Sequence, residues 1–141
     1  TDNAINLGAG SARWKEIYAA TGTINTSDGR EKQQIRPLNE AERAVALRLK
    51  GLIKAFKFND AVQEKGDKAR IHFGVIAQEV KAAFEAEGLN AEDYALFCYD
   101  EWPEQPEMSD KEGNIVQEYR PAGNRYGIRY EELLAFVISA L

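Results

Sequence analysis

The spacing of apolar residues in this chain changes near residue 38, and this change limits what the chain can fold into. Residues 1–26 hold three glycines and only short apolar pieces, such as the run 14–18. A segment of this kind cannot bury a core alone, so we expect short strands, turns and one helical turn over 12–19 that need a packing partner. Beyond residue 38 the apolar spacing becomes periodic, which predicts a compact, small mixed α+β domain.

Helix boundary signals mark the start and end of two elements in this domain. Asn39 and Glu42 form a capping-box pattern that starts a helix ending near Gly51. A second helix is expected from Ala77 to about Glu87, where Gly88 stops it. The inward-facing residues should be Ala41, Val45, Leu47 and Leu49 in the first helix and Val80, Ala83 and Phe84 in the second.

A third helix is expected over residues 130–141. Its apolar residues follow the spacing i, i+1, i+4, i+5 and i+8, and they are Leu133, Leu134, Val137, Ile138 and Leu141. This stripe is typical of a coiled-coil seam or of a helix face in a core. Three interpretations stay open: the helix continues past residue 141, it ends in a subunit interface, or it docks on its own domain.

Short runs with partial period-two alternation predict antiparallel strands between the helices. A polar hairpin loop is expected at 60–68 and a turn at 108–114. The acidic piece 110–114 lacks the twelve-residue ligand pattern of a calcium loop, so a β-turn is expected there. The strands themselves are predicted at 52–58, 70–76, 94–102, 115–120 and 126–130.

Composition argues against several function classes. The 141 residues carry a net charge of −5 and no basic stripe, which disfavours nucleic acid as a partner. No apolar run reaches the roughly 18 residues of a membrane span. The single Cys98 and single His72 cannot form an internal disulfide or a multi-ligand zinc site, and no phosphate loop is present, so we expect neither metal nor cofactor. Without a signal-peptide pattern, a soluble protein made in a reducing compartment is expected.

Ser27 and Lys32 stand five residues apart, after a short β-type run and before a polar segment. A lysine beside a serine can accept the hydroxyl proton when the lysine is uncharged, although this spacing alone is common by chance. Two charged residues lie between them. The Arg30 guanidinium is a candidate for assisting the lysine or stabilising an oxyanion, whereas Asp28 either orients the turn or opposes the chemistry by favouring charged lysine.

Four motifs in a fixed order carry a resemblance to a known family. They are LGAGSARWKEIY at 7–18, GTINTSDGREK at 22–32, HFGVIAQEV at 72–80 and YGIRY at 126–130. Together they resemble the C-terminal intramolecular chaperone domain of phage tail spikes and tail fibres, the self-cleaving peptidase family known from endosialidase tail spikes. The resemblance covers essentially the whole chain, and an L-shaped tail fibre is one candidate for the parent protein.

The resemblance implies a homotrimer whose folding client is the preceding fibre segment of its own chain. It implies autoproteolysis of the Thr26–Ser27 bond, with Ser27 as nucleophile and Lys32 as proton acceptor in a Ser-Lys dyad. Residues 1–26 would be the β-rich end of the mature fibre, and residues 27–141 the chaperone and autoprotease that is released. Assembly would take place in the host cytoplasm, and the mature fibre would join the virion tail.

Two alternatives stay open at this point. His72 has apolar neighbours, and it is expected to be a hydrogen-bonded structural histidine or a second base that supports the active loop. The whole domain, in turn, is either the self-cleaving chaperone or a non-catalytic trimerisation or host-binding foot of a fibre. The substitution Lys32→Ala distinguishes these two functions, because self-cleavage depends on the Lys32 side chain and a non-catalytic foot does not.

Overall fold

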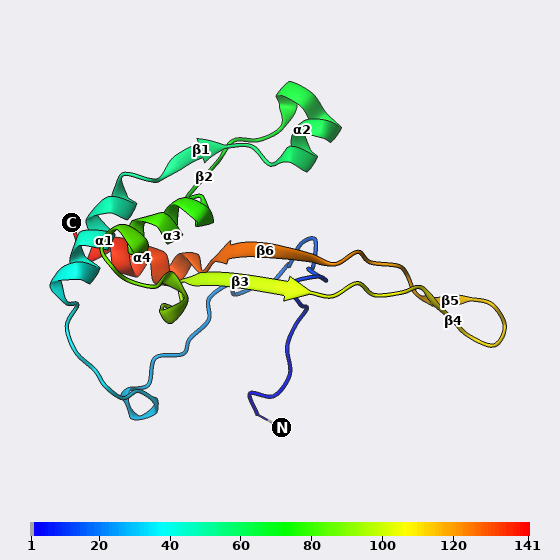
Figure 1. Ribbon diagram of the computed structural model, residues 1–141, viewed down its shortest axis with the longest axis horizontal. Coiled ribbons are helices and arrows are strands. Elements are labelled where there is room, and N and C mark those ends of the chain that lie inside the picture. Colours follow the sequence, from blue (N-terminus) through cyan, green and yellow to red (C-terminus); the bar gives the residue numbers. More distant parts are fainter. Residues whose placement is uncertain (1) are drawn as a thin grey trace. The chain divides into compact units, whose positions relative to one another are not determined.

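The computed structural model describes residues 2–141 (Figure 1). The chain forms two compact units: one joins the N-terminal residues up to Pro37 to Asp100–Arg125, and the other joins Leu38–Tyr99 to Tyr126–Leu141. All α-helices of the described residues lie in the second unit, together with short paired strands. The expected small mixed α+β class is confirmed.

Helix α1, Glu40–Lys50, begins where predicted because the capping box forms. The Asn39 side chain accepts a hydrogen bond from the Glu42 N–H at 2.8 Å, and Glu42 Oε1 accepts one from the Asn39 N–H at 2.9 Å. Glu42 is buried, and its Oε2 accepts a bond from the Tyr94 hydroxyl at 2.9 Å. Both oxygens of this carboxylate are therefore hydrogen-bonded, which offsets the cost of burying it.

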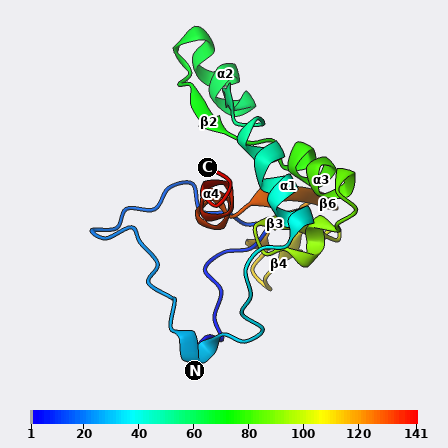
Figure 2. The ribbon, with the colours of Figure 1, turned by 90° about the vertical axis from the view of Figure 1, so that its left-hand side faces the viewer.

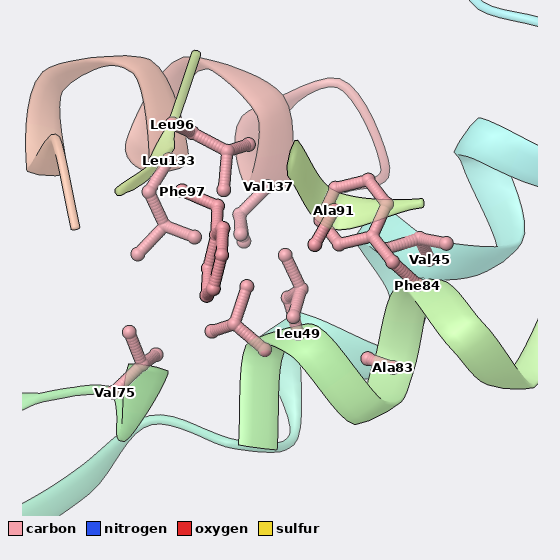
Figure 3. Packing of buried hydrophobic residues seen from close by; sticks show 11 residues of the cluster. Val45, Leu49, Val75, Ala83, Phe84, Ala91, Leu96, Phe97, Leu133 and Val137 are labelled. Carbon is pink, nitrogen blue, oxygen red and sulfur yellow. The ribbon is translucent and has the colours of Figure 1, made fainter. Parts of the chain in front are cut away.

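The core of the second unit lies where α1 meets α3, Ala77–Ala86, and α4, Tyr130–Ile138. Figure 3 shows side chains from these helices and from the start of β3, Phe97–Trp102, pointing toward one another. Full burial of a large apolar side chain contributes about 1.5–3 kcal/mol each. The largest fully buried side chains are Phe84, Leu49, Leu133, Val45 and Val80.

Most of the predicted inward-facing residues of α1 and α3 are confirmed, but Leu47 is not. Leu47 is 56% exposed, and Ala46 is buried instead. Successive helical residues turn by about 100°, so Leu47 lies on the side of α1 opposite Val45. Helix α3 ends as predicted, since Gly88 adopts φ +74°, a conformation that glycine tolerates best.

Helix α4 divides its apolar stripe between core and surface. Leu133 and Val137 are buried, as the i, i+4 spacing of one core-facing row allows. The second row consists of Leu134 and Ile138, followed by Leu141 three residues beyond the end of α4, and these side chains are 49–81% exposed. Helix α4 therefore packs on its own domain through the first row. The second row remains an exposed apolar face in this single chain.

An arm made of β1, Lys54–Phe56, α2, Asn59–Lys65, and β2, His72–Gly74, projects from the helices (Figures 1 and 2). The strands pair antiparallel, with Lys54 opposite Gly74. The prediction of a polar loop at 60–68 is wrong, because this segment holds most of α2 and the 3₁₀ turn η2, Gly66–Lys68. Its residues Ala61 to Lys65 are mostly good helix formers, and Gly66, at φ +56°, ends the helix.

Gly74 and Tyr130 connect two of the sequence motifs. The Tyr130 hydroxyl accepts a hydrogen bond from the Val75 N–H at 3.2 Å and donates one to the Val75 carbonyl at 3.4 Å. A Cβ on Gly74 would overlap the Tyr130 phenol oxygen. Position 74 therefore has no room for a side chain while Tyr130, in the first turn of α4, is bonded to Val75, the residue that follows β2.

The remaining strands differ from the prediction mainly at their ends. Strand β3 begins at Phe97 because a 3₁₀ turn, η3, Ala91–Asp93, precedes it, and it pairs with β6, Gly123–Ile128. Residues 108–114 are not all turn: β4, Met108–Ser109, pairs antiparallel with β5, Ile115–Gln117. The expected turn forms at 110–114, where the Asp110 carboxylate accepts hydrogen bonds from backbone N–H groups.

Residues 2–26 form neither the predicted helical turn nor the predicted short strands. Their only β pairing among described residues is an isolated bridge between Ala9 and Ala12. Trp14, Ile17 and Tyr18 are 62–89% exposed, so the apolar face that was to stabilise the helical turn finds no partner in the single chain. Within residues 2–141, no helix has the length and apolar character that crossing a membrane requires.

Candidate active site

The segment that carries Ser27 and Lys32 folds into a 3₁₀ turn, η1, Gly29–Glu31. Asp28 caps this turn, and its Oδ1 accepts a hydrogen bond from the Arg30 N–H at 2.9 Å. The turn is closed by the Lys32 N–H, which donates to the Gly29 carbonyl at 3.2 Å. An aspartate followed by glycine favours such a turn because the side chain bonds backbone N–H groups two residues on.

The turn brings the two predicted dyad side chains into contact. Lys32 Nζ donates a hydrogen bond to Ser27 Oγ at 2.8 Å. Both residues are exposed, and so is Thr26 on the other side of the predicted scissile bond. The pair therefore has the separation needed for proton transfer, in a place that water reaches freely in the single chain.

Asp28 and Arg30 bond to each other. The Arg30 Nη2 donates to Asp28 Oδ2 at 2.7 Å, and Arg30 Nε lies 3.2 Å from both carboxylate oxygens. This side-chain contact, followed by the bond from the Arg30 N–H, lowers the pKa of Asp28, and it raises the pKa of Arg30. Of the two roles considered for Asp28, these contacts favour orienting the turn, because its charge is bonded to Arg30.

His72 lies elsewhere in the chain, on β2 of the second compact unit, while Ser27 belongs to the first. It is exposed, and its ring stacks on Phe56 with centroids 5.8 Å apart and meets the edge of Phe58 at 4.8 Å. His72 is therefore part of an aromatic cluster with Phe56 and Phe58 in the arm.

Sequence reasoning missed that residues 100–125 belong to the same compact unit as Ser27. No local pattern could reveal this, because the association joins segments about a hundred residues apart. The residues described by the structure hold no group of three His, Cys, Asp or Glu side chains that could bind a metal ion.

Comparison with known proteins adds an independent observation. The family model described as chaperone of endosialidase matches residues 27–89, so the match begins at Ser27. The tail spike protein of Escherichia virus K5 is 40% identical over 130 residues, which are 91% of this chain and 20% of that protein. The chain thus spans about a tenth to a fifth of the curated relatives it matches first.

Two solved structures share the fold. The carboxy-terminal domain of the bacteriophage T5 L-shaped tail fibre, solved with its intramolecular chaperone domain, gives a TM-score of 0.82 at 33% identity and covers 99% of this chain and 34% of that one. A structure described as a novel intramolecular chaperone gives a TM-score of 0.70 at 44% identity, over 81% of this chain and 93% of that one. The chain therefore belongs to the endosialidase chaperone family of intramolecular chaperone domains.

Proposed function

We propose that this chain is the intramolecular chaperone of a phage tail fibre or tail spike and that it releases itself by cutting its own Thr26–Ser27 bond. The observation that carries the proposal is the 2.8 Å hydrogen bond between Lys32 Nζ and Ser27 Oγ. A second observation supports the position of the cut, since the family match begins at residue 27. On this proposal residues 27–141 are the chaperone and residues 1–26 are the end of the fibre.

The cleavage is an acyl shift followed by hydrolysis. Ser27 Oγ attacks the carbonyl carbon of Thr26, and its proton passes to uncharged Lys32 Nζ. The C–N bond breaks as the Ser27 nitrogen takes a proton, so Thr26 is left as an ester on Oγ. Water then hydrolyses this ester, which gives the Thr26 carboxylate and restores the Ser27 hydroxyl. Each chain cuts one bond, once.

Assembly offers a reason for the exposure of the dyad in the single chain. A lysine is uncharged more readily when it is removed from water, so a subunit contact that covers Lys32 would start the reaction. Helix α4 and the residue Leu141 beyond its end supply an apolar surface for self-association, because Leu134, Ile138 and Leu141 are spaced i, i+4 and i+7 and are exposed. A homotrimer would therefore couple cleavage to assembly and prevent early loss of the chaperone.

The client of this chaperone is the fibre segment that precedes it. One solved relative is a tail fibre domain carrying its own intramolecular chaperone, which is the arrangement proposed here. Residues 2–26 lack strands in the single chain, and pairing between chains of a trimer would supply the missing strand partners. Folding would take place in the host cytoplasm, after which the fibre joins the virion tail and the chaperone part is released.

Substitution of the lysine tests this function. In the 1–141 chain, Lys32→Ala should abolish the cut, whereas Lys111→Ala, at an exposed turn position, should cut at the wild-type rate. The intact masses of both variants and the trimer fraction from light scattering are followed at neutral pH. A trimeric wild-type chain that stays whole, or a Lys32→Ala chain that cuts normally, would overturn the dyad and favour the non-catalytic trimerisation or host-binding foot.

A further inference from the structure

One point in the N-terminal segment is covered by other parts of the chain. Across residues 2–37, every residue is exposed except Gly10 and Ser11, which are half-buried. These two residues form the tip of a tight turn, in which the Ala9 and Ala12 backbones exchange hydrogen bonds of 3.0 and 3.1 Å. The turn is therefore the place where the segment is held.

Two arginines from residues 100–125 bond to the tip of this turn. Arg125 Nη1 donates to the Gly10 carbonyl at 2.5 Å, and Arg120 Nη1 lies 3.4 Å from the Ser11 carbonyl. All four residues belong to the same compact unit. The carbonyls of Gly10 and Ser11 face the two arginines together only when the turn is formed. Guanidinium groups that bond these backbone carbonyls therefore recognise the conformation of the turn.

Arg125 is held in place by an aromatic side chain. Its guanidinium lies over the Trp102 ring at 5.3 Å from the ring centre, and Trp102 Nε1 donates to the Pro121 carbonyl at 3.2 Å. The ring packs so closely on Gly123 that a Cβ there would lie 2.9 Å from it. The arginine that bonds Gly10 is thus positioned by its neighbours, which lowers the entropy cost of binding.

Glycine is required at the tip of the turn. A Cβ on Gly10 would lie 2.8 Å from Asp100 Cβ, a separation that real Cβ atoms essentially never show, and 3.0 Å from Asp100 Cγ. By contrast, nothing lies within 4 Å of a Cβ placed on Gly22. The fit is therefore specific to a glycine at position 10.

We propose that Asp100, Trp102, Arg120 and Arg125 form a binding site for the Ala9–Ala12 turn, which holds the fibre end on the chaperone without a covalent bond. The occupant is a tight turn of this chain with a glycine at its tip and two carbonyls facing the arginines. The name fibre end rests on the proposed function, whereas the binding site itself does not. After a cut at Thr26–Ser27, this site is what delays separation of the two pieces.

Hydrogen exchange tests the site in the whole chain with Ser27→Ala, so that no cut intervenes. Amides within 8–14 should exchange about tenfold faster in Arg125→Gln and in Gly10→Ala, since loss of one charge-assisted bond weakens an equilibrium by about that factor. Gly22→Ala and Arg70→Gln are the matched controls and should leave the rate unchanged. Protection of the core helices checks folding in every variant.

Two results would overturn the proposed binding site. One is that wild-type amides within 8–14 exchange as fast as those within 15–21. The other is that amides within 8–14 exchange at equal rates in Gly10→Ala and Gly22→Ala. A second measurement uses the chain with Ser27 intact. If it cuts, the fragments 1–26 and 27–141 should elute together and separate about tenfold sooner in Arg125→Gln; immediate separation in both would refute the site. If it never cuts, the proposed cleavage fails, and hydrogen exchange alone decides the binding site.

Discussion

Gly74→Ala should destabilise the second unit through its contact with Tyr130. The new Cβ would overlap the phenol oxygen and lie 3.1 Å from Tyr130 Cζ and 3.3 Å from Phe56 Cε1. Because the ring must move, the hydroxyl loses its hydrogen bonds to the Val75 backbone. One lost bond costs about 0.5–1.5 kcal/mol and overpacking about 1–3 kcal/mol, so the free energy of unfolding should fall by about 1.5–4.5 kcal/mol.

A double-mutant cycle shows whether this contact is the cause. Tyr130→Phe alone should cost about 1 kcal/mol, because it removes the hydroxyl and leaves the Val75 N–H with water. In that background Gly74→Ala meets no phenol oxygen, so its cost should fall by about 1–2 kcal/mol, a coupling expected of residues in contact.

Urea unfolding at one fixed protein concentration measures all four chains, with Ser27→Ala in each to keep the covalent state constant. An equal cost of Gly74→Ala in the tyrosine and phenylalanine backgrounds would show that the Tyr130 hydroxyl does not cause the loss of stability. It would mean that the strain arises from Phe56 or from the backbone of β2.

Two further predictions concern the caps of α1 and η1. Asn39→Ala should lower the free energy of unfolding by about 1 kcal/mol in the same urea assay, because it removes the bond to the Glu42 N–H; no change would mean that solvent replaces the cap fully. The Arg30 contact lowers the pKa of Asp28, so the cap should be intact above the ordinary aspartate pKa and be lost as the pH falls through the lowered value. The carboxyl carbon shift of Asp28 should titrate below that of an unfolded peptide, and an equal midpoint would contradict the contact.

Local signals predicted the parts of the fold that depend on neighbouring residues. The capping box at Asn39 and the stop at Gly88 are local, and both are confirmed. The contact between Ser27 and Lys32 is also local, because the turn between them starts from Asp28. Such features need no knowledge of the rest of the chain.

The sequence predictions fail where burial depends on distant segments, or where a helix is made of polar residues and so lacks an apolar pattern. Helix α2 has no apolar periodicity, so its sequence gives no pattern to find. The helical turn at 12–19 was expected from an apolar face that finds no partner in the single chain. The contact of Gly10 with Asp100 and Arg125 joins segments about a hundred residues apart, and only the structure reveals it.

Release of the proposed chaperone depends on a cut before Ser27. The most direct measurement is the intact mass of freshly purified 1–141 beside its Ser27→Ala variant, both incubated at neutral pH with their oligomeric state recorded. We expect a fragment that begins at Ser27 in the wild-type sample and only the whole chain in the variant. If both samples stay whole while trimeric, or both are cut at the same bond, Ser27 is not the nucleophile and the self-cleavage account is contradicted.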